Sequence, residues 1–196
     1  TVHLDAPRTI GNLTFGDTAT NTPAGWILDN NGSALNILTL AGTTPTITVN
    51  ALGTNVWDRS ATISAEIAGS GGLTKAGVGV LTLSASNTFS GTTTVTNKGI
   101  LAISNPSALG STSGGTTVAD GQLRLIGGIT VAGEALTLRG NYSDAMGRGA
   151  LRSHSGSNVW AGPITLAAGA ETWINASGGP LTLTGGIIGT NRSLRL

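Results

Sequence analysis

The chain has 196 residues, with 31 Gly, 30 Thr and no Cys; charged residues make up 10% of it and the formal net charge is +1. This composition is too hydrophobic and too weakly charged for a disordered protein, and a near-neutral chain with singly spread basic residues argues against nucleic-acid binding. The lack of Cys excludes a disulfide scaffold and a Cys-ligated zinc site, and the longest uncharged run, residues 30–57, is so often interrupted by polar residues, Gly and Pro that we expect no membrane insertion by this segment.

Short apolar–Thr–apolar triplets recur along the chain and are candidate strands. Because successive side chains of a strand alternate between its faces, each triplet points two aliphatic side chains inward and one Thr outward. Gly, Asn or Ser usually follows within a few residues, as tight turns require, and helix signals are nearly absent. In chain order the triplets are residues 38–40, 47–49, 81–83, 129–131, 136–138, 164–166 and 181–183, and the two ends, 1–4 and 193–196, also resemble strands.

The arrangement of these strands distinguishes two kinds of all-β fold. A sandwich or barrel also has short strands at uniform spacing. Strands of three to six residues with similar segments at long range favour a solenoid, and a coil of about twenty residues gives roughly nine to ten coils. At the ~4.8 Å spacing of paired strands this is a rod of about 45 Å. The predicted core positions are Leu81, Leu83, Val95, Leu101, Leu136, Leu138, Ile164, Leu166, Leu181 and Leu183.

The segment 71–110 carries a more specific signal. Residues 71–84 read GGLTKAGVGVLTLS, residues 87–95 read NTFSGTTTV, and Gly99-Ile100-Leu101 and Ala108-Leu109-Gly110 follow. This closely resembles the autotransporter-associated β-strand repeat, also called the passenger-associated transport repeat. The resemblance implies a right-handed parallel β-helix in a bacterial passenger that is extracellular or on the outer-membrane cell surface.

The two strand-like ends carry no polar capping segment, which a free-standing solenoid requires. An uncapped coil exposes unpaired backbone groups that can pair with another chain. We therefore expect a single solenoid domain, 1–196, that is either a segment of a longer passenger or a subunit that stacks end to end. Its partner is then the flanking solenoid of the same chain or a second copy, and the candidate stacking residues are Val2, Leu4, Leu194 and Leu196.

Signatures of catalysis are absent from the sequence. No Ser has Gly two residues before and two after it, as a nucleophile elbow needs. The two His residues, His3 and His154, lie in no metal-binding motif and are interpreted as solvated turn or edge residues. The nine acidic residues are scattered, although Asp120 and Asp144 could meet one coil apart. We predict no catalytic residue, no cofactor and no metal site.

Two sets of residues are candidates for ligand contact. The densest charge cluster, Arg139, Arg148 and Arg152, could bind an anionic glycan or a partner carboxylate, although a structural role in a turn is the favoured alternative for Arg152. The four Trp residues could form a sugar-stacking platform, whereas Trp160 is expected to pack under a turn. The four are Trp26, Trp57, Trp160 and Trp173.

Three functions remain open, in decreasing order of support. The first is a non-catalytic structural solenoid that forms a stiff stalk or an end-to-end filament. The second is an adhesin-type module that binds surface glycans or matrix through the Arg cluster or exposed Trp. The third is a polysaccharide-cleaving β-helix enzyme, for which fold analogy alone is a weak argument.

Overall fold

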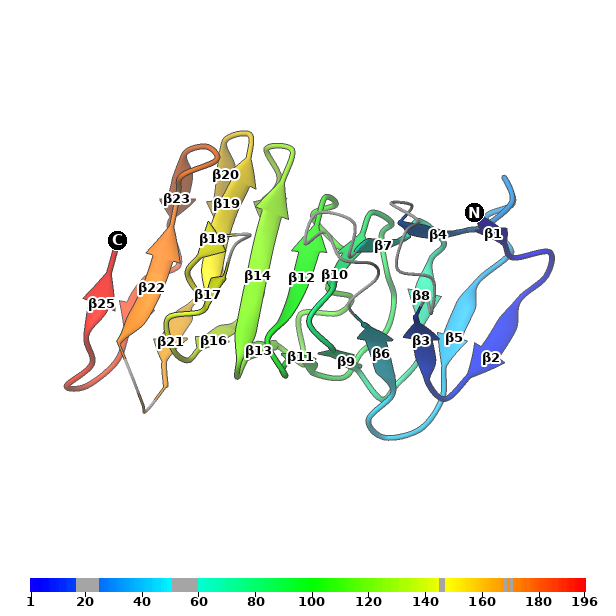
Figure 1. The fold of residues 1–196 in the computed structure, drawn as a ribbon, viewed down its shortest axis with the longest axis horizontal. Coiled ribbons are helices and arrows are strands. Elements are labelled where there is room, and N and C mark those ends of the chain that lie inside the picture. Colours follow the sequence, from blue (N-terminus) through cyan, green and yellow to red (C-terminus); the bar gives the residue numbers. More distant parts are fainter. Residues whose placement is uncertain (17–24, 51–59, 145–146, 168, 170) are drawn as a thin grey trace.

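The computed structural model describes residues 1–16, 25–50, 60–144, 147–167, 169 and 171–196. The regular secondary structure in this part of the chain consists of β-strands alone, which confirms the predicted all-β fold. Parallel pairing joins the strands of one coil to the equivalent strands of the next, so that long sheets run along the molecule (Figure 1).

Two large sheets form most of the wall. The nine-stranded sheet has the spatial order β1 (Val2–His3), β4 (Trp26–Asp29), β7 (Ser60–Ile63), β10 (Val80–Leu83), β12 (Gly99–Ile103), β14 (Gly121–Ile126), β19 (Leu151–Ser155), β22 (Thr172–Asn175) and β25 (Leu194–Arg195). The eight-stranded sheet has the order β24 (Ile187–Ile188), β21 (Ile164–Leu166), β16 (Leu136–Leu138), β13 (Thr116–Val118), β11 (Thr93–Val95), β9 (Leu73–Ala76), β6 (Thr46–Val49) and β3 (Leu13–Phe15).

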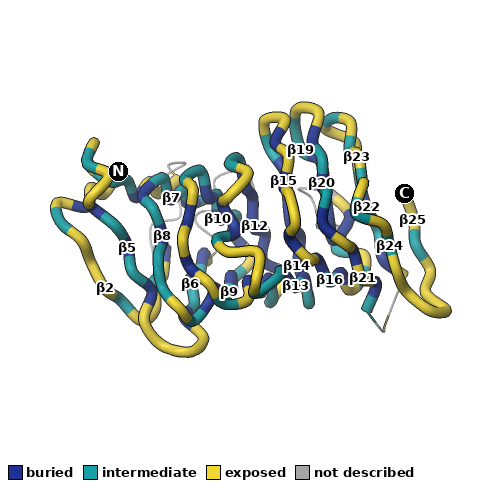
Figure 2. The backbone as a smooth tube through the Cα atoms, turned by 180° about the vertical axis from the view of Figure 1, so that it is seen from behind, coloured by how far each residue is buried: buried dark blue, intermediate teal, exposed yellow. Residues whose placement is uncertain are grey.

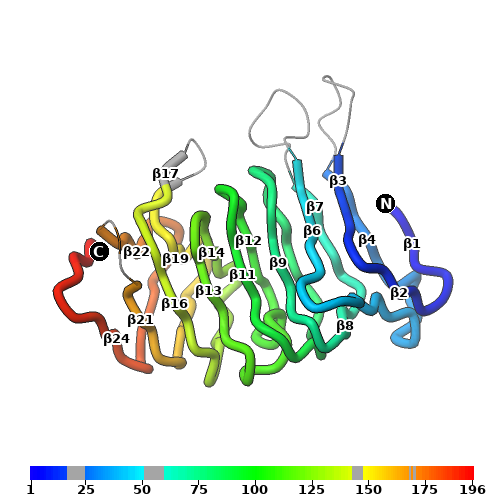
Figure 3. Tube along the Cα trace, turned by 90° about the horizontal axis from the view of Figure 1, so that it is seen from below, coloured from blue at the N-terminus to red at the C-terminus, as the bar shows by residue number. Residues whose placement is uncertain are grey.

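Three small sheets complete the fold. One contains β2 (Arg8–Ile10), β5 (Leu38–Leu40) and β8 (Ile67–Ala68), and another contains β15 (Thr130–Val131), β20 (Asn158–Trp160) and β23 (Leu181–Leu183). The third is a hairpin of β17 (Ser143–Asp144) and β18 (Gly147–Arg148), whose pairing is antiparallel. The coils follow one another along a single axis, with the two termini at opposite ends (Figure 3). The structure is therefore a parallel β-helix, as the sequence predicts.

The core consists of columns of aliphatic side chains at equivalent positions of successive coils. In the nine-stranded sheet, one inward column contains Leu81, Leu101, Leu123 and Leu151. In the eight-stranded sheet, another contains Val95, Val118, Leu138 and Leu166. Exposed residues gather at the turns and at the two ends of the stack (Figure 2). Burial of these columns is the main favourable term in folding.

Eight of the ten predicted core residues are buried, and the other two, Leu181 and Leu183, are half-buried and pack against the core near the C-terminal end. The predicted outward position of Thr is also confirmed, because the central Thr of the triplets Leu38–Leu40 and Leu136–Leu138 lies between two buried Leu residues. On the outer face of the eight-stranded sheet, register pairing stacks Thr46, Thr74, Thr94, Thr117, Thr137 and Thr165 in one column. These hydroxyls give the wall a polar exterior without charge.

Candidate functional site

Trp173 has two cationic neighbours on the outer face of the β-helix, near its C-terminal end. On β22, Thr172 and Ile174 are buried, so the alternation of the strand places Trp173 outward. Arg195 of β25 pairs with Trp173 in register, and its Cζ atom lies 4.6 Å from the centroid of the indole ring. Arg148 of β18 supplies a second guanidinium, with its Cζ atom 5.5 Å from the centroid. Both distances lie within the range of a cation–π interaction.

Polar groups and a shallow hollow complete this region, which we call the Trp173 site. The indole Nε1 atom donates a hydrogen bond to the carboxylate of Glu171, which fixes the edge of the ring. A hollow of about 200 Å³ is bordered by Arg148, Trp173, Ile174, Asn175, Arg195 and Leu196. The site thus combines an aromatic surface, two cations and an amide at one place on the wall.

The three arginines that the sequence groups together lie on different elements. Arg148 belongs to the Trp173 site. Arg152 lies on β19 in register with Arg124 on one side and Asn175 on the other, so it belongs to the wall of the nine-stranded sheet. Arg139 is exposed directly after β16 of the eight-stranded sheet. Grouping the arginines by their proximity in the sequence therefore missed Arg195. Arg195 follows Trp173 by about one predicted coil, and this spacing could have indicated that the two residues are neighbours.

The four Trp residues also differ in position. Trp160 is fully buried, as predicted, and Trp26 is partly exposed at the N-terminal end. Trp57 lies outside the described residues. The described Trp residues therefore do not form a common sugar-stacking platform. Among them, Trp173 is the residue with cationic neighbours.

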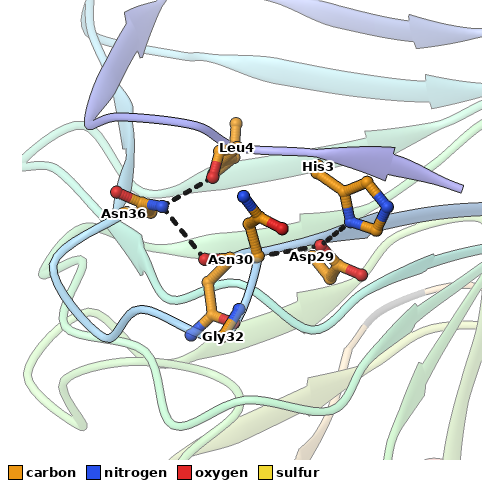
Figure 4. A network of polar contacts seen from close by, with 7 residues as sticks. His3, Leu4, Asp29, Asn30, Gly32 and Asn36 are labelled. Carbon is orange, nitrogen blue, oxygen red and sulfur yellow. Dashed lines mark hydrogen bonds and ion pairs between the residues drawn. The ribbon is translucent and has the colours of Figure 1, made fainter.

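The titratable groups elsewhere make structural contacts. His3 Nδ1 lies 2.6 Å from Asp29 Oδ1 and links β1 to β4 (Figure 4). Burial, with the positive charges of Arg124 and Arg152, lowers the pKa of His154. Glu134 is buried and accepts a hydrogen bond of 2.7 Å from Thr116 Oγ1; burial raises the pKa of Glu134 and this bond offsets part of the increase.

The described part of the structure does not show the candidate catalytic carboxylates of Asp120 and Asp144 close together. Asp120 is exposed, and the side chain of Asp144 is outside the described part of the structure. Among the described residues, no group of three or more His, Asp or Glu side chains could hold a metal ion. In the same part of the chain, no helix is long and apolar enough to span a membrane.

A second hollow, of about 440 Å³, lies on the outer side of the eight-stranded sheet. Its polar lining consists of hydroxyl groups, and glycines supply much of the rest. These glycines have a packing role, because a Cβ atom on Gly71 would lie 1.9 Å from the carbonyl oxygen of Gly42. Gly71 therefore allows two turns to stack closely at this place.

The ends of the helix present open sheet edges and apolar side chains. At the N-terminal end, Val2 is 46% exposed, whereas Leu4 is only 7% exposed. At the C-terminal end, Leu194 is half-buried and Leu196 is 85% exposed. Of the four candidate stacking residues, Val2 and Leu196 are therefore the ones with substantial exposed surface, while Leu4 is part of the core.

A parallel stack of short coils whose buried columns continue from coil to coil defines the class of β-solenoid repeat proteins. Residues 73–103 match the family model described as Passenger-associated-transport-repeat, which confirms the predicted resemblance of segment 71–110 to this repeat family. The family places the chain outside the cell or on the outer-membrane surface, as the sequence predicts.

The chain is also similar to a curated protein, Adhesin BmaC autotransporter of Brucella suis biovar 1 (strain 1330), with 36% identity over 196 aligned positions. The match covers 91% of this chain and only 5% of the length of that relative. No solved structure matches the chain.

Proposed function

We propose that the chain is a stiff, non-catalytic stalk segment of a bacterial surface passenger. The observation that carries this proposal is the continuous parallel pairing of the nine-stranded sheet, which links coils from Val2 to Arg195 with one register shift between β14 and β19. Because the hydrogen bonds between coils point along the stack, bending the rod would have to stretch many of them together. A rod of this kind holds other parts of a passenger away from the cell surface.

A non-catalytic role is supported by what the buried titratable groups do. Glu134 is bound by Thr116, and Lys75 donates to backbone carbonyls within its own turn. The similar protein is named an adhesin, which is a binding function. Each of these facts favours structure or binding over bond cleavage.

Small-angle X-ray scattering combined with an activity assay tests the stalk proposal. The expected result is a rod-shaped particle that lengthens by ~4.8 Å for each coil inserted, together with no release of reducing ends from acidic polysaccharides. A compact particle, or sustained release of reducing ends, would contradict the proposal. The Leu138→Asp variant, which should not fold, is the control that shows the rod shape to depend on the fold.

The open edges at the two ends lead to a proposal about partners. β1, β2 and β3 form one end and β23, β24 and β25 form the other, so each end presents the outermost strand of three sheets. We propose that flanking coils of the same passenger continue these sheets, and that in their absence copies of the chain stack end to end through Val2 and Leu196. Such heterologous contacts do not close and produce fibres.

Negative-stain microscopy at micromolar concentration tests the stacking. Thin fibres are expected, and a charged capping segment fused after Leu196 should suppress them. Strictly monomeric particles would contradict stacking of copies.

A second candidate function is an adhesin-type module that binds glycans or matrix surfaces. The observation that favours it is the Trp173 site, where an aromatic ring and two cations meet on the outer wall. Binding on a glycan array that is lost in the Arg148→Ala variant is the expected result. An array without signal would contradict this function and leave the stalk untouched.

A further inference from the structure

We propose that the Trp173 site binds one acidic sugar unit of an oligosaccharide, with Arg148 and Arg195 holding its acidic group. This proposal rests on the second function above, the adhesin-type module, and adds the class of ligand. The shared chemistry is a carboxylate or sulfate group on a sugar ring.

The register of the solenoid creates the cationic pair. Trp173 and Arg195 are cross-strand partners on the outer face of β22 and β25. Arg148 reaches the same ring from β18, which lies between β16 and β19 in the chain. Two arginines that are distant in sequence are thus held on one indole ring, and the stacking limits the freedom of both guanidinium groups.

The charges at the site favour an anion. Arg148 and Arg195 are both exposed, and within the described residues neither forms an ion pair. The nearby carboxylate of Glu171 accepts the indole N–H. Both guanidinium groups border the same hollow, so an anion placed in it would be attracted by both charges. Guanidinium groups bind carboxylate and sulfate oxygens through paired N–H donors, which suits such an anion.

The size and surroundings of the hollow favour a sugar as the carrier of that anion. Its volume of about 200 Å³ is below the range of roughly 300–1,000 Å³ for sites that enclose a whole drug-sized molecule. One unit of a longer chain that runs over the surface fits this volume. The indole offers an apolar edge to the sugar ring. The Oδ1 atom of Asn175 accepts a hydrogen bond from the Ser177 amide, and its Nδ2 group is a donor for a sugar hydroxyl. Nucleic acid is disfavoured because the chain has a net charge of +1 and lacks a basic stripe.

Isothermal titration of the chain with four probes tests the proposal. The probes are a hyaluronan octasaccharide, which carries carboxylates, a heparin octasaccharide, which also carries sulfates, neutral maltooctaose, and an oligothymidine of similar length. At low salt, at least one acidic octasaccharide should bind and maltooctaose should not. Hyaluronan binding identifies the carboxylate as sufficient, and binding of heparin alone identifies the sulfate.

Surface variants locate the binding. Arg195→Gln and Arg148→Gln each remove one charge while keeping most of the side-chain length, and each should weaken binding by about tenfold or more, since hydrogen bonds to charged groups are the strong ones. Arg139→Gln is the matched control, because Arg139 is also exposed but lies on another element, and it should bind like the wild type. Circular dichroism melts confirm that the variants are folded.

The inference would be overturned by no binding of either acidic octasaccharide, by equal weakening in Arg139→Gln, or by equal binding of oligothymidine. Binding of maltooctaose that is unaffected by the Arg variants would also overturn it while leaving the adhesin function intact. The scattering test of the stalk is independent of all these outcomes.

Discussion

Inside the solenoid, the Nζ atom of Lys75 donates a hydrogen bond of 2.7 Å to the carbonyl oxygen of Gly77. A second bond of 2.7 Å runs to the carbonyl oxygen of Ala76. The side chain points into the core because Lys75 pairs in register with Ile47 and Val95, both fully buried. Lys75 therefore satisfies the carbonyl groups of a tight turn from within, where water cannot.

The buried amine should make stability depend on pH. Burial lowers the pKa of Lys75 to about 7 from its ordinary value of 10.5. Between these values the unfolded chain holds a proton that the folded chain has released, so the free energy of unfolding should rise with pH from about 7 to 10.5, by at most about 1.4 kcal/mol per pH unit. Below pH 7 this residue contributes no pH dependence. Urea unfolding at several pH values measures the effect.

The Lys75→Met variant should lose this rise, because Met fills a similar volume and does not titrate. Lys98→Met, at an exposed position, is the control and should keep the wild-type slope. An unchanged slope in Lys75→Met would contradict the assignment.

The side chain of Asn87 links the coils on either side of it through hydrogen bonds to their backbones. Its Oδ1 atom accepts a hydrogen bond of 2.8 Å from the Ile67 amide, and its Nδ2 atom donates one of 2.6 Å to the Ala108 carbonyl. Asn87→Leu should destabilise the fold by about 2–6 kcal/mol, because two buried backbone groups lose their partners at about 1–3 kcal/mol each. Thermal or urea unfolding measures this loss.

The matched control is Asn105→Ala, which removes one exposed bond to the Ser107 amide and should cost about 1 kcal/mol or less. Equal losses for the two variants would show that the Asn87 bridge is not a special support of the stack.

The N-terminal strand is held by a polar network around Asp29 (Figure 4). The hydrogen bond to His3 and the one from the Asn31 amide lower the pKa of Asp29. A carboxylate whose pKa is lowered by folding stabilises the fold at pH values above its pKa in the unfolded chain. This contribution is lost as the pH falls through the lower pKa of the folded chain. The Leu4 amide, which donates to the Asp29 carbonyl, reports on the strand by hydrogen exchange.

Asp29→Asn should therefore reduce the protection of the Leu4 amide at neutral pH, and the difference from wild type should shrink as the pH is lowered. Asp5→Asn, which breaks the exposed contact with Arg8, should leave this amide protected. A loss of protection that is the same at all pH values would show that the charge of Asp29 is not its cause.

The repeating part of the fold could be predicted from the sequence, whereas its exceptions could not. Triplets such as Leu81-Thr82-Leu83 carry their own strand signal, because the alternation of side chains is local. The Trp173 site depends on which distant strands become neighbours, and the register between Trp173 and Arg195 is a property of the assembled coils. Lys75 was missed as a core residue because Lys is almost never fully buried unless it is paired.

Leu138 provides the sharpest test of the fold because it occupies the middle of an inward column. It is fully buried between Val118 and Leu166. Leu138→Ala should cost about 2–5 kcal/mol through lost burial and the resulting cavity, and Leu138→Asp should abolish cooperative unfolding, since an unpaired buried charge costs far more than a buried methyl group contributes. Thr165→Asp places the same charge on the exposed outer face of the adjacent strand and should melt within about 1 kcal/mol of wild type. A cooperative melt in Leu138→Asp would mean that this column does not lie inside the solenoid.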